Sequence, residues 1–140
     1  MKIFCCEGQN LCSLNSFYEE LAERDNAVWK SAGEAMLGLL KNLHSHPDNK
    51  QVYGLISNYM LCFLSENNCN SPRFVTITTP SKRRYHIEFL MPKATAPWRQ
   101  PTFVRGETHS ESEAIEMIII AMEQSGGWAS DEPEHYMAPK

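Results

Sequence analysis

Residues 74–91 read FVTITTPSKRRYHIEFLM, and their pattern predicts a β-hairpin. The first part is rich in β-branched residues, and residues 80–83 supply a proline-led turn. The second part alternates apolar and polar side chains, with Tyr85, Ile87, Phe89 and Met91 on one side and Arg84, His86 and Glu88 on the other. This alternation is typical of an antiparallel sheet that buries one face and leaves the other wetter.

The sequence before this hairpin has the period of helices. A first short helix can begin at Ser13 or Ser16, and a longer one is expected from Ala27 to the turn before Pro47. A further helix is expected to be capped by Asp48 and to end at Glu66-Asn67-Asn68. Its apolar stripe consists of Val52, Leu55, Ile56, Tyr59, Met60 and Phe63. Two such stripes joined by a short polar turn predict an antiparallel helical hairpin.

The sequence after the hairpin predicts a loop, a strand and a helix. Three prolines surround Trp98 in residues 92–101, which favours a loop. Residues 102–105 suit a short strand that ends at Gly106, and Thr108 or Ser110 can cap the helix that follows. That helix carries more apolar surface than one face needs, so we expect it to be covered on two sides or to lie in a subunit interface.

The predicted fold class is therefore α+β, with a helical hairpin and a C-terminal helix packed on one face of a three- or four-stranded antiparallel sheet. Residues 1–127 are expected to form one domain, with a helical part over 13–67 and a sheet–helix part over 72–126. Residues 2–6 are compatible with one additional strand, and residues 128–140 are read as an acidic flexible tail.

Composition narrows the class of protein. The chain has 140 residues, 42% of them hydrophobic and 21% charged, which is ordinary globular usage. No apolar run approaches the roughly 18 to 20 residues that span a bilayer, and the start lacks a secretory signal, so a cytoplasmic location and no membrane partner are expected. Five cysteines without such a signal favour reduced thiols, and the spacing of Cys5, Cys6 and Cys12 does not suit zinc.

Charge is unevenly distributed along the chain. Residues 71–106 hold seven basic residues and one acidic residue, whereas residues 107–140 hold eight acidic residues and one basic residue. A basic sheet surface is expected to bind an acidic partner, and the predicted binding residues are Lys82, Arg83, Arg84, His86, Trp98, Arg99 and Arg105. The alternative is that the basic side chains only discourage pairing of strand edges.

The sequence offers little support for catalysis. It has no phosphate-binding glycine loop, no Gly-x-Ser-x-Gly elbow and no His-Glu-x-x-His motif. His44, His46 and Asp48 lie in a predicted turn, where polar residues are expected without a metal. The chain is therefore predicted to be a non-enzyme without cofactor or metal, and a thiol- or metal-dependent enzyme is the least favoured reading.

Two resemblances concern the C-terminal half. The order of elements over residues 72–124, with a helix before them, resembles the α-β-β-β-α arrangement of double-stranded RNA-binding domains, but acidic residues occupy 109–113 where that family has a basic motif. Residues 106–115 are similar to the step into the helix of HicB-type antitoxins, with two extra residues before Ala114, and small phage-encoded α-β-β-β-α sandwich proteins end comparably. These resemblances imply a phage or mobile-element protein.

The predicted function is that of a small regulatory or inhibitory protein-binding module, of the antitoxin, immunity or phage anti-defence type, which docks through the basic sheet surface. The alternative is a nucleic-acid-binding protein that uses the same basic residues. The excess apolar surface of the last helix also suggests a homodimer through Ile115, Ile119 and Met122.

Overall fold

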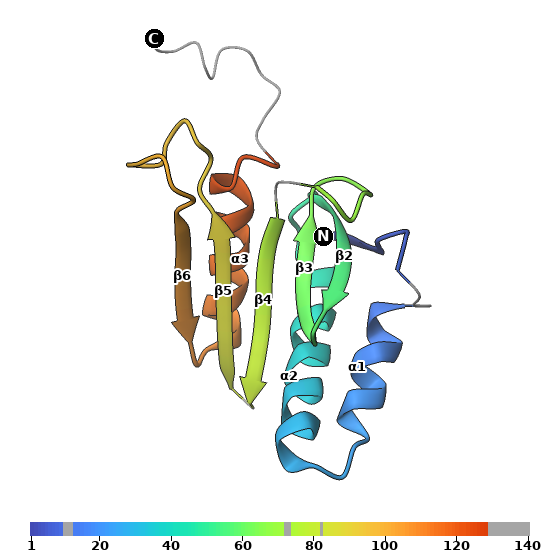
Figure 1. Ribbon diagram of the computed structural model, residues 1–140. Coiled ribbons are helices and arrows are strands. Elements are labelled where there is room, and N and C mark those ends of the chain that lie inside the picture. Colours follow the sequence, from blue (N-terminus) through green and yellow to red (C-terminus); the bar gives the residue numbers. More distant parts are fainter. Residues whose placement is uncertain (10–12, 72–73, 82, 129–140) are drawn as a thin grey trace.

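The computed structural model describes residues 1–9, 13–71, 74–81 and 83–128. Within them lies a six-stranded sheet with the strands in chain order (Figure 1). The first strand pairs in parallel with the second, and every later pair is antiparallel. In chain order the elements are β1 (Lys2–Cys5), α1 (Leu14–Ala22), α2 (Ala27–His44), β2 (Gln51–Ser57), β3 (Met60–Leu64), β4 (Phe74–Ser81), β5 (Arg84–Leu90), β6 (Phe103–Thr108) and α3 (Glu111–Gln124).

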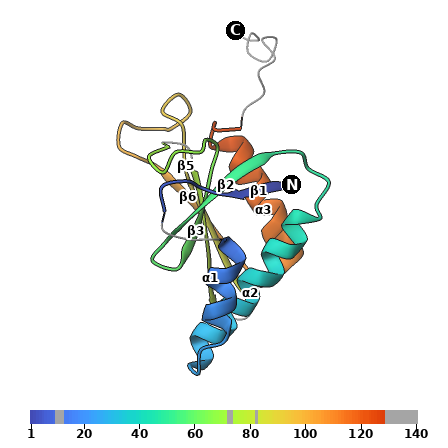
Figure 2. The same cartoon turned by 90° about the vertical axis from the view of Figure 1, so that its right-hand side faces the viewer.

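The helices lie on one side of the sheet (Figure 2). α2 packs on β4, α3 packs over β5 with contacts to β4 and β6, and α1 packs on α2. The core lies between the layers, where Val75 and Ile77 of β4 and Ile87 and Phe89 of β5 are buried. Thr79 is also buried on this side, and its hydroxyl donates to the Ala32 carbonyl of α2 at 2.9 Å.

The predicted helix between Asp48 and Glu66 is wrong, because residues 51–64 form the β2–β3 hairpin. Its apolar residues fit a strand period as well, since Val52, Leu61 and Phe63 are fully buried on the helix side. Asn58 and Tyr59 have φ values of 50° and 68°, the left-handed geometry of a tight two-residue hairpin turn. Asp48, expected near the start of that helix, instead accepts a hydrogen bond from the Lys50 amide at 2.8 Å.

The helical hairpin exists, but α1 and α2 form it. Ser13 caps α1 by accepting from the Ser16 amide, and Asn26 caps α2 by accepting from the amides of Val28 and Trp29. The helices approach most closely at Gly33, where an added Cβ would lie 2.7 Å from the Ala22 amide nitrogen. The pair connects β1 to β2, so the sheet is mixed rather than purely antiparallel, and it is wider than predicted.

The C-terminal half agrees with the prediction in outline. The α+β class is confirmed, and β4, β5, β6 and α3 occur in the predicted order. Gly106 does not end the third of these strands, because β6 runs on to Thr108. A Cβ on Gly106 would lie 2.3 Å from the Met117 methyl group, so the missing side chain lets α3 lie close to the sheet.

α3 begins after Ser110, whose hydroxyl accepts from the Glu113 amide. Ile115 and Met122 are buried in the core and offer little surface to a second copy, whereas Ile119 is partly exposed and packs against the core. The exposed apolar residue of α3 is Ile120. Trp128, placed at the start of the predicted tail, donates from Nε1 to the Gln51 carbonyl at 2.8 Å. Residues 129–140 lie outside the described residues.

Candidate functional site

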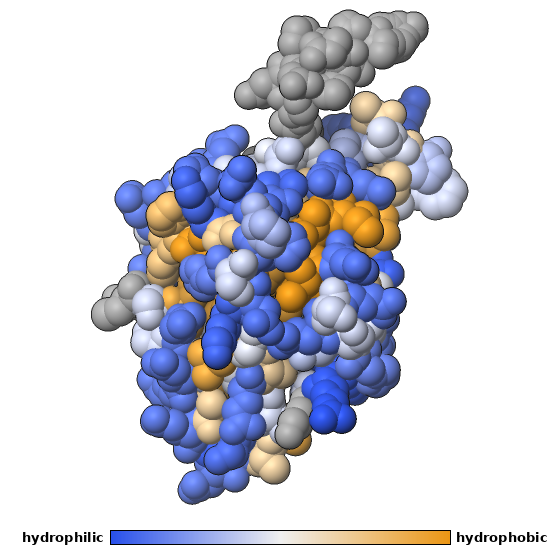
Figure 3. Space-filling model, turned by 180° about the vertical axis from the view of Figure 1, so that it is seen from behind, coloured by the Kyte–Doolittle hydropathy of each residue, from blue (hydrophilic) through white to orange (hydrophobic). Residues whose placement is uncertain are grey.

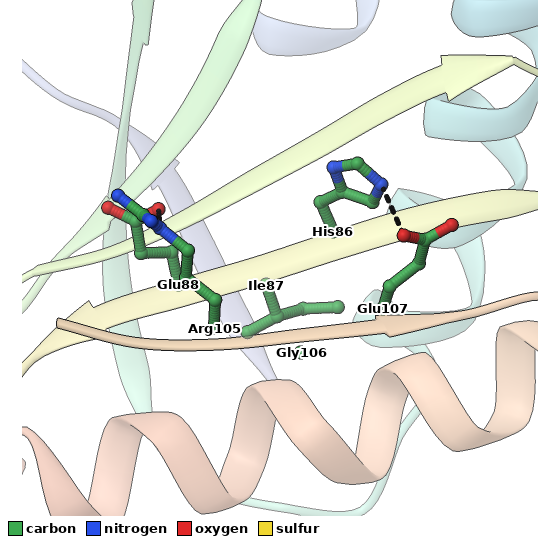
Figure 4. A pocket seen from close by; sticks show the side chains of 6 residues that line it. All are labelled: His86, Ile87, Glu88, Arg105, Gly106 and Glu107. Carbon is green, nitrogen blue, oxygen red and sulfur yellow. Dashed lines mark hydrogen bonds and ion pairs between the residues drawn. The ribbon is translucent and has the colours of Figure 1, made fainter.

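The side of the sheet opposite the helices carries a ladder of alternating charges on β5 and β6. His86 lies opposite Glu107, and Glu88 lies opposite Arg105. Arg105 Nε donates to Glu88 Oε1 at 2.7 Å, and His86 Nε2 lies 3.2 Å from Glu107 Oε1 (Figure 4). Arg84 adds a second contact to Glu107, from Nη2 to Oε2 at 3.2 Å. Basic and acidic side chains thus neutralise one another along this part of the face.

Glu107 connects the two parts of the chain that differ in charge. It is the first residue of the acidic segment, residues 107–140, yet it pairs with Arg84 and His86 of the basic segment, residues 71–106. The hydrogen bond from Arg84 lowers the pKa of the Glu107 carboxyl, with further lowering by the nearby His86 and His109. The basic strip predicted from sequence is therefore a mixed surface where Arg84, His86 and Arg105 lie beside Glu88 and Glu107.

A shallow hollow lies between the two charged pairs. The side chain of Ile87 points into the core, so the backbone of Ile87 and Gly106 forms the floor of the hollow. The pairs His86–Glu107 and Glu88–Arg105 form its sides (Figure 4).

An apolar row crosses the same face from one edge of the sheet to the other. Phe4 stacks on Tyr53 with the ring centroids 5.6 Å apart, and Phe4 and Phe103, at opposite edges, are both 45% exposed. Each residue of the row lies opposite the next one on the neighbouring strand. Phe74 and Leu90 are neighbours because Val75 pairs with Phe89. The row consists of Phe4, Tyr53, Leu64, Phe74, Leu90 and Phe103.

The loop after β5 adds an aromatic and basic group at one end of this face. Lys93, Pro97, Trp98 and Arg99 line an open hollow there, and Trp98 is 64% exposed. In the described part of the chain no carboxylate pairs with Lys93 or Arg99. This end of the face therefore has uncompensated positive charge beside a large exposed ring.

The structure brings together only some of the residues predicted for the site. Arg84, His86 and Arg105 lie together in the charge ladder. Arg83 lies in the turn before β5, whereas Trp98 and Arg99 lie in the loop after it, so the length of β5, about 20 Å, separates them. Lys82 lies outside the described residues.

Sequence reasoning missed two acidic members of this surface. Glu88 was set on the polar side of its strand but was given no role, and Glu107 was assigned to the acidic C-terminal segment. Alternation already placed Glu88 beside His86 on the polar face. Extending β6 past Gly106 would have placed Glu107 on that face as well, but the contact itself joins residues 23 positions apart.

The cysteines and histidines are the sequence's candidates for a metal- or thiol-dependent site. Among the residues that the structure describes, no group of three or more His, Cys, Asp or Glu side chains could hold a metal ion. Burial raises the pKa of the Cys6 thiol, with smaller contributions from Cys69 and Cys5, and burial also raises the pKa of Cys62. Raised pKa values lower the thiolate fraction and disfavour a nucleophilic role. Cys12 lies outside the described residues.

Comparisons of the chain with protein-family models, curated proteins and solved structures find no match. Among the described residues, no helix combines the length and the apolar character needed to cross a membrane.

Proposed function

We propose that this chain is a protein-binding module of regulatory or inhibitory type, and that the sheet face opposite the helices is its docking surface. The observation that carries the proposal is the composition of this face: an apolar row, a ladder of opposite charges and an exposed tryptophan all lie on the side that no described helix covers.

The apolar row supports a docking role. The hydrophobic core lies between the helices and the side of the sheet that they cover. The aromatic residues at both ends of the row nevertheless remain exposed, where they have no role in this core. Leu64 is only 2% exposed, so the row divides into two groups, Phe4 with Tyr53 on one side and Phe74, Leu90 and Phe103 on the other. Exposed apolar groups of this kind are found at interaction sites.

The charges favour a protein over a nucleic acid. Binding to a phosphate backbone requires basic groups that are not already neutralised. In the ladder, Arg84 and Arg105 are paired with Glu107 and Glu88, so their charge is largely compensated. A mixed pattern of both signs gives register and specificity at a protein interface.

The uncompensated positive charge lies in the Trp98 loop. Arg99 and Lys93 stand beside the exposed ring, and tryptophan and arginine are the residues that most often dominate binding energy. The partner is therefore proposed to place an acidic patch over this loop and apolar side chains over the row.

The proposal can be tested by affinity capture from the native host lysate. The surface variant is Trp98→Ala with Arg99→Glu, and the matched control is Val28→Ala with Lys30→Glu on the exposed side of α2. Each variant truncates one exposed apolar side chain and reverses one basic charge. Each capture is made with and without nuclease, and the captured protein is then purified and its affinity measured by calorimetry.

We expect one protein to bind the wild type and the control with equal affinity and to be lost from the surface variant, with or without nuclease. Binding that survives in the surface variant and is lost in the control would refute this docking surface. Capture that disappears with nuclease would instead favour nucleic-acid binding through the same loop, because phosphate contacts would then carry the interaction.

A further inference from the structure

β6 is an edge strand whose outer side is open. In the described part of the chain it has a neighbour, β5, on one side only. Five of its six residues are partly or largely exposed. An edge of this kind offers unpaired backbone N–H and C=O groups to a further strand.

The hydrogen-bond pattern fixes which backbone groups point outward. The Met91 amide donates to the Thr102 carbonyl at 2.8 Å, so Thr102 directs its backbone groups toward β5. Because these directions alternate along an antiparallel strand, Val104, Gly106 and Thr108 also point inward. The groups of Phe103, Arg105 and Glu107 therefore point away from the sheet.

This alternation restricts how a second copy of the same strand can pair in antiparallel fashion. Outward residues must face outward residues, so Arg105 can lie opposite Phe103, Arg105 or Glu107 of the second copy. The Phe103 register sets Glu107 opposite Pro101, which has no N–H to donate, and the Arg105 register places like charges in direct opposition, which is destabilising. The Glu107 register places Gly106 opposite Gly106 and forms two Arg105–Glu107 pairs related by a two-fold axis.

The charge ladder continues across such a contact. Within one chain Glu88 is next to Arg105, and Glu107 is next to His86 and Arg84. Pairing Arg105 with Glu107 of the second copy gives a row that alternates acidic, basic, acidic and basic from one β5 to the other. The edge is thus complementary in charge to itself.

Apolar surface on the helix side adjoins the same edge. A hollow of about 150 Å³ between α3 and β6 is lined by apolar residues that include Val104, Met117 and Ile120. Ile120 is 49% exposed and Val104 is 39% exposed. Figure 3, which shows the molecule from behind, has apolar surface gathered on the side where α3 and β6 lie. The two-fold axis would bring two such surfaces face to face.

We propose that the chain forms a symmetric homodimer in which the β6 edges pair antiparallel about Gly106 and join the two sheets into one. The apolar hollows beside α3 then cover each other on the helix side. This interface differs from the one predicted through Ile115, Ile119 and Met122, and it does not depend on the docking function.

The test reverses the charge of Arg105 in one variant and of Glu107 in another. Sedimentation equilibrium of the purified proteins then measures how strongly each one dimerises. Arg105→Glu alone places two carboxylates opposite each other at both symmetry-related contacts, and Glu107→Arg alone places two guanidinium groups opposite each other at both. Each variant by itself is expected to dimerise at least about tenfold more weakly than the wild type, because each change counts twice. An equal mixture of the two is expected to form a heterodimer, in which both contacts again join opposite charges.

Rescue in the mixture separates the contact between chains from contacts within one chain, since mixing repairs neither Arg105–Glu88 nor Arg84–Glu107. Lys30→Glu, on α2 and outside the edge, serves as the control and should dimerise as the wild type does. A wild type that sediments only at the chain mass of 16.0 kDa, or a mixture that does not associate, would overturn the proposal.

Amide hydrogen exchange provides a measurement that needs no variant. The outward amides of Arg105 and Glu107 should become protected as the protein concentration rises, because dimerisation gives them partners. Rapid exchange of both amides at every concentration would also overturn the proposal.

Discussion

Two glycines in the same helix provide a direct test of the α1–α2 hairpin. Gly33 and Gly38 both lie inside α2, where glycine is less favourable than alanine by about 1 kcal/mol. An alanine at either position gains this helix propensity. The two sites differ in what a new Cβ would contact, so the difference between the two variants isolates the packing of α1.

At Gly33 the Cβ would lie 2.7 Å from the Ala22 nitrogen and 2.8 Å from the Tyr18 carbonyl oxygen. Both atoms belong to the α1 backbone, so α1 as a whole would have to move. At Gly38 the nearest atom is the Glu111 carboxylate at 3.1 Å, the end of a flexible side chain. Overpacking against a rigid neighbour costs about 1 to 3 kcal/mol, so Gly33→Ala should be less stable than Gly38→Ala by about that amount.

The assay is urea denaturation of both variants and the wild type, followed by far-ultraviolet circular dichroism. Gly38→Ala should raise the free energy of unfolding by about 0.5 to 1 kcal/mol, whereas Gly33→Ala should lower it or leave it unchanged. Equal stabilisation by both substitutions would contradict this packing, because it would mean that no backbone lies against Gly33.

Three further predictions concern the turn after α2, the sheet and the thiols. Burial alone would raise the pKa of Asp48, but hydrogen bonds from Lys50 outweigh it and lower this pKa. Asp48→Asn should therefore cost about 1 kcal/mol at pH 7 in urea titrations. That loss should fade as the pH drops through the folded-state pKa of Asp48, and a pH-independent loss would contradict this view. Thr79→Val removes a buried hydrogen bond to α2 and should cost about 1 kcal/mol, whereas Thr79→Ser should cost less in the same titration, and the reverse order would contradict the contact. The exposed Cys69 should react with iodoacetamide before Cys6, which is buried and has a raised thiol pKa, and peptide mapping that finds Cys6 modified first would disprove the burial.

The strands that the sequence predicts well are those with a strict alternation. In residues 84–90 each inward position is apolar and each of the first three outward positions is polar, so only a strand fits. The β2–β3 segment was mistaken for a helix because Val52, Ile56 and Phe63 satisfy both periods. Gly54 inside the segment was a local signal against a helix, because glycine is unfavourable in a helix interior by about 1 kcal/mol. In the structure its missing side chain admits Leu14 of α1. Asn58, which tolerates the left-handed turn geometry, was another such signal.

The candidate site was predictable in part. Alternation along β5 places Arg84, His86 and Glu88 on one face without any knowledge of the tertiary structure. The neutralisation of Arg84 by Glu107 was not predictable, because it depends on how far β6 extends and on its register with β5. Charge counted along the sequence therefore overstated the positive charge of the surface.

We propose that the sheet face opposite the helices binds a protein partner. Cross-linking in the native host tests this, with Thr76, at the centre of that face, replaced by a photo-cross-linking amino acid and the same group placed at Lys30 of α2 as the control. We expect a discrete protein adduct from position 76 that is absent from position 30. Adducts from position 30 alone, or no adduct from position 76 while the folded protein is present, would contradict it.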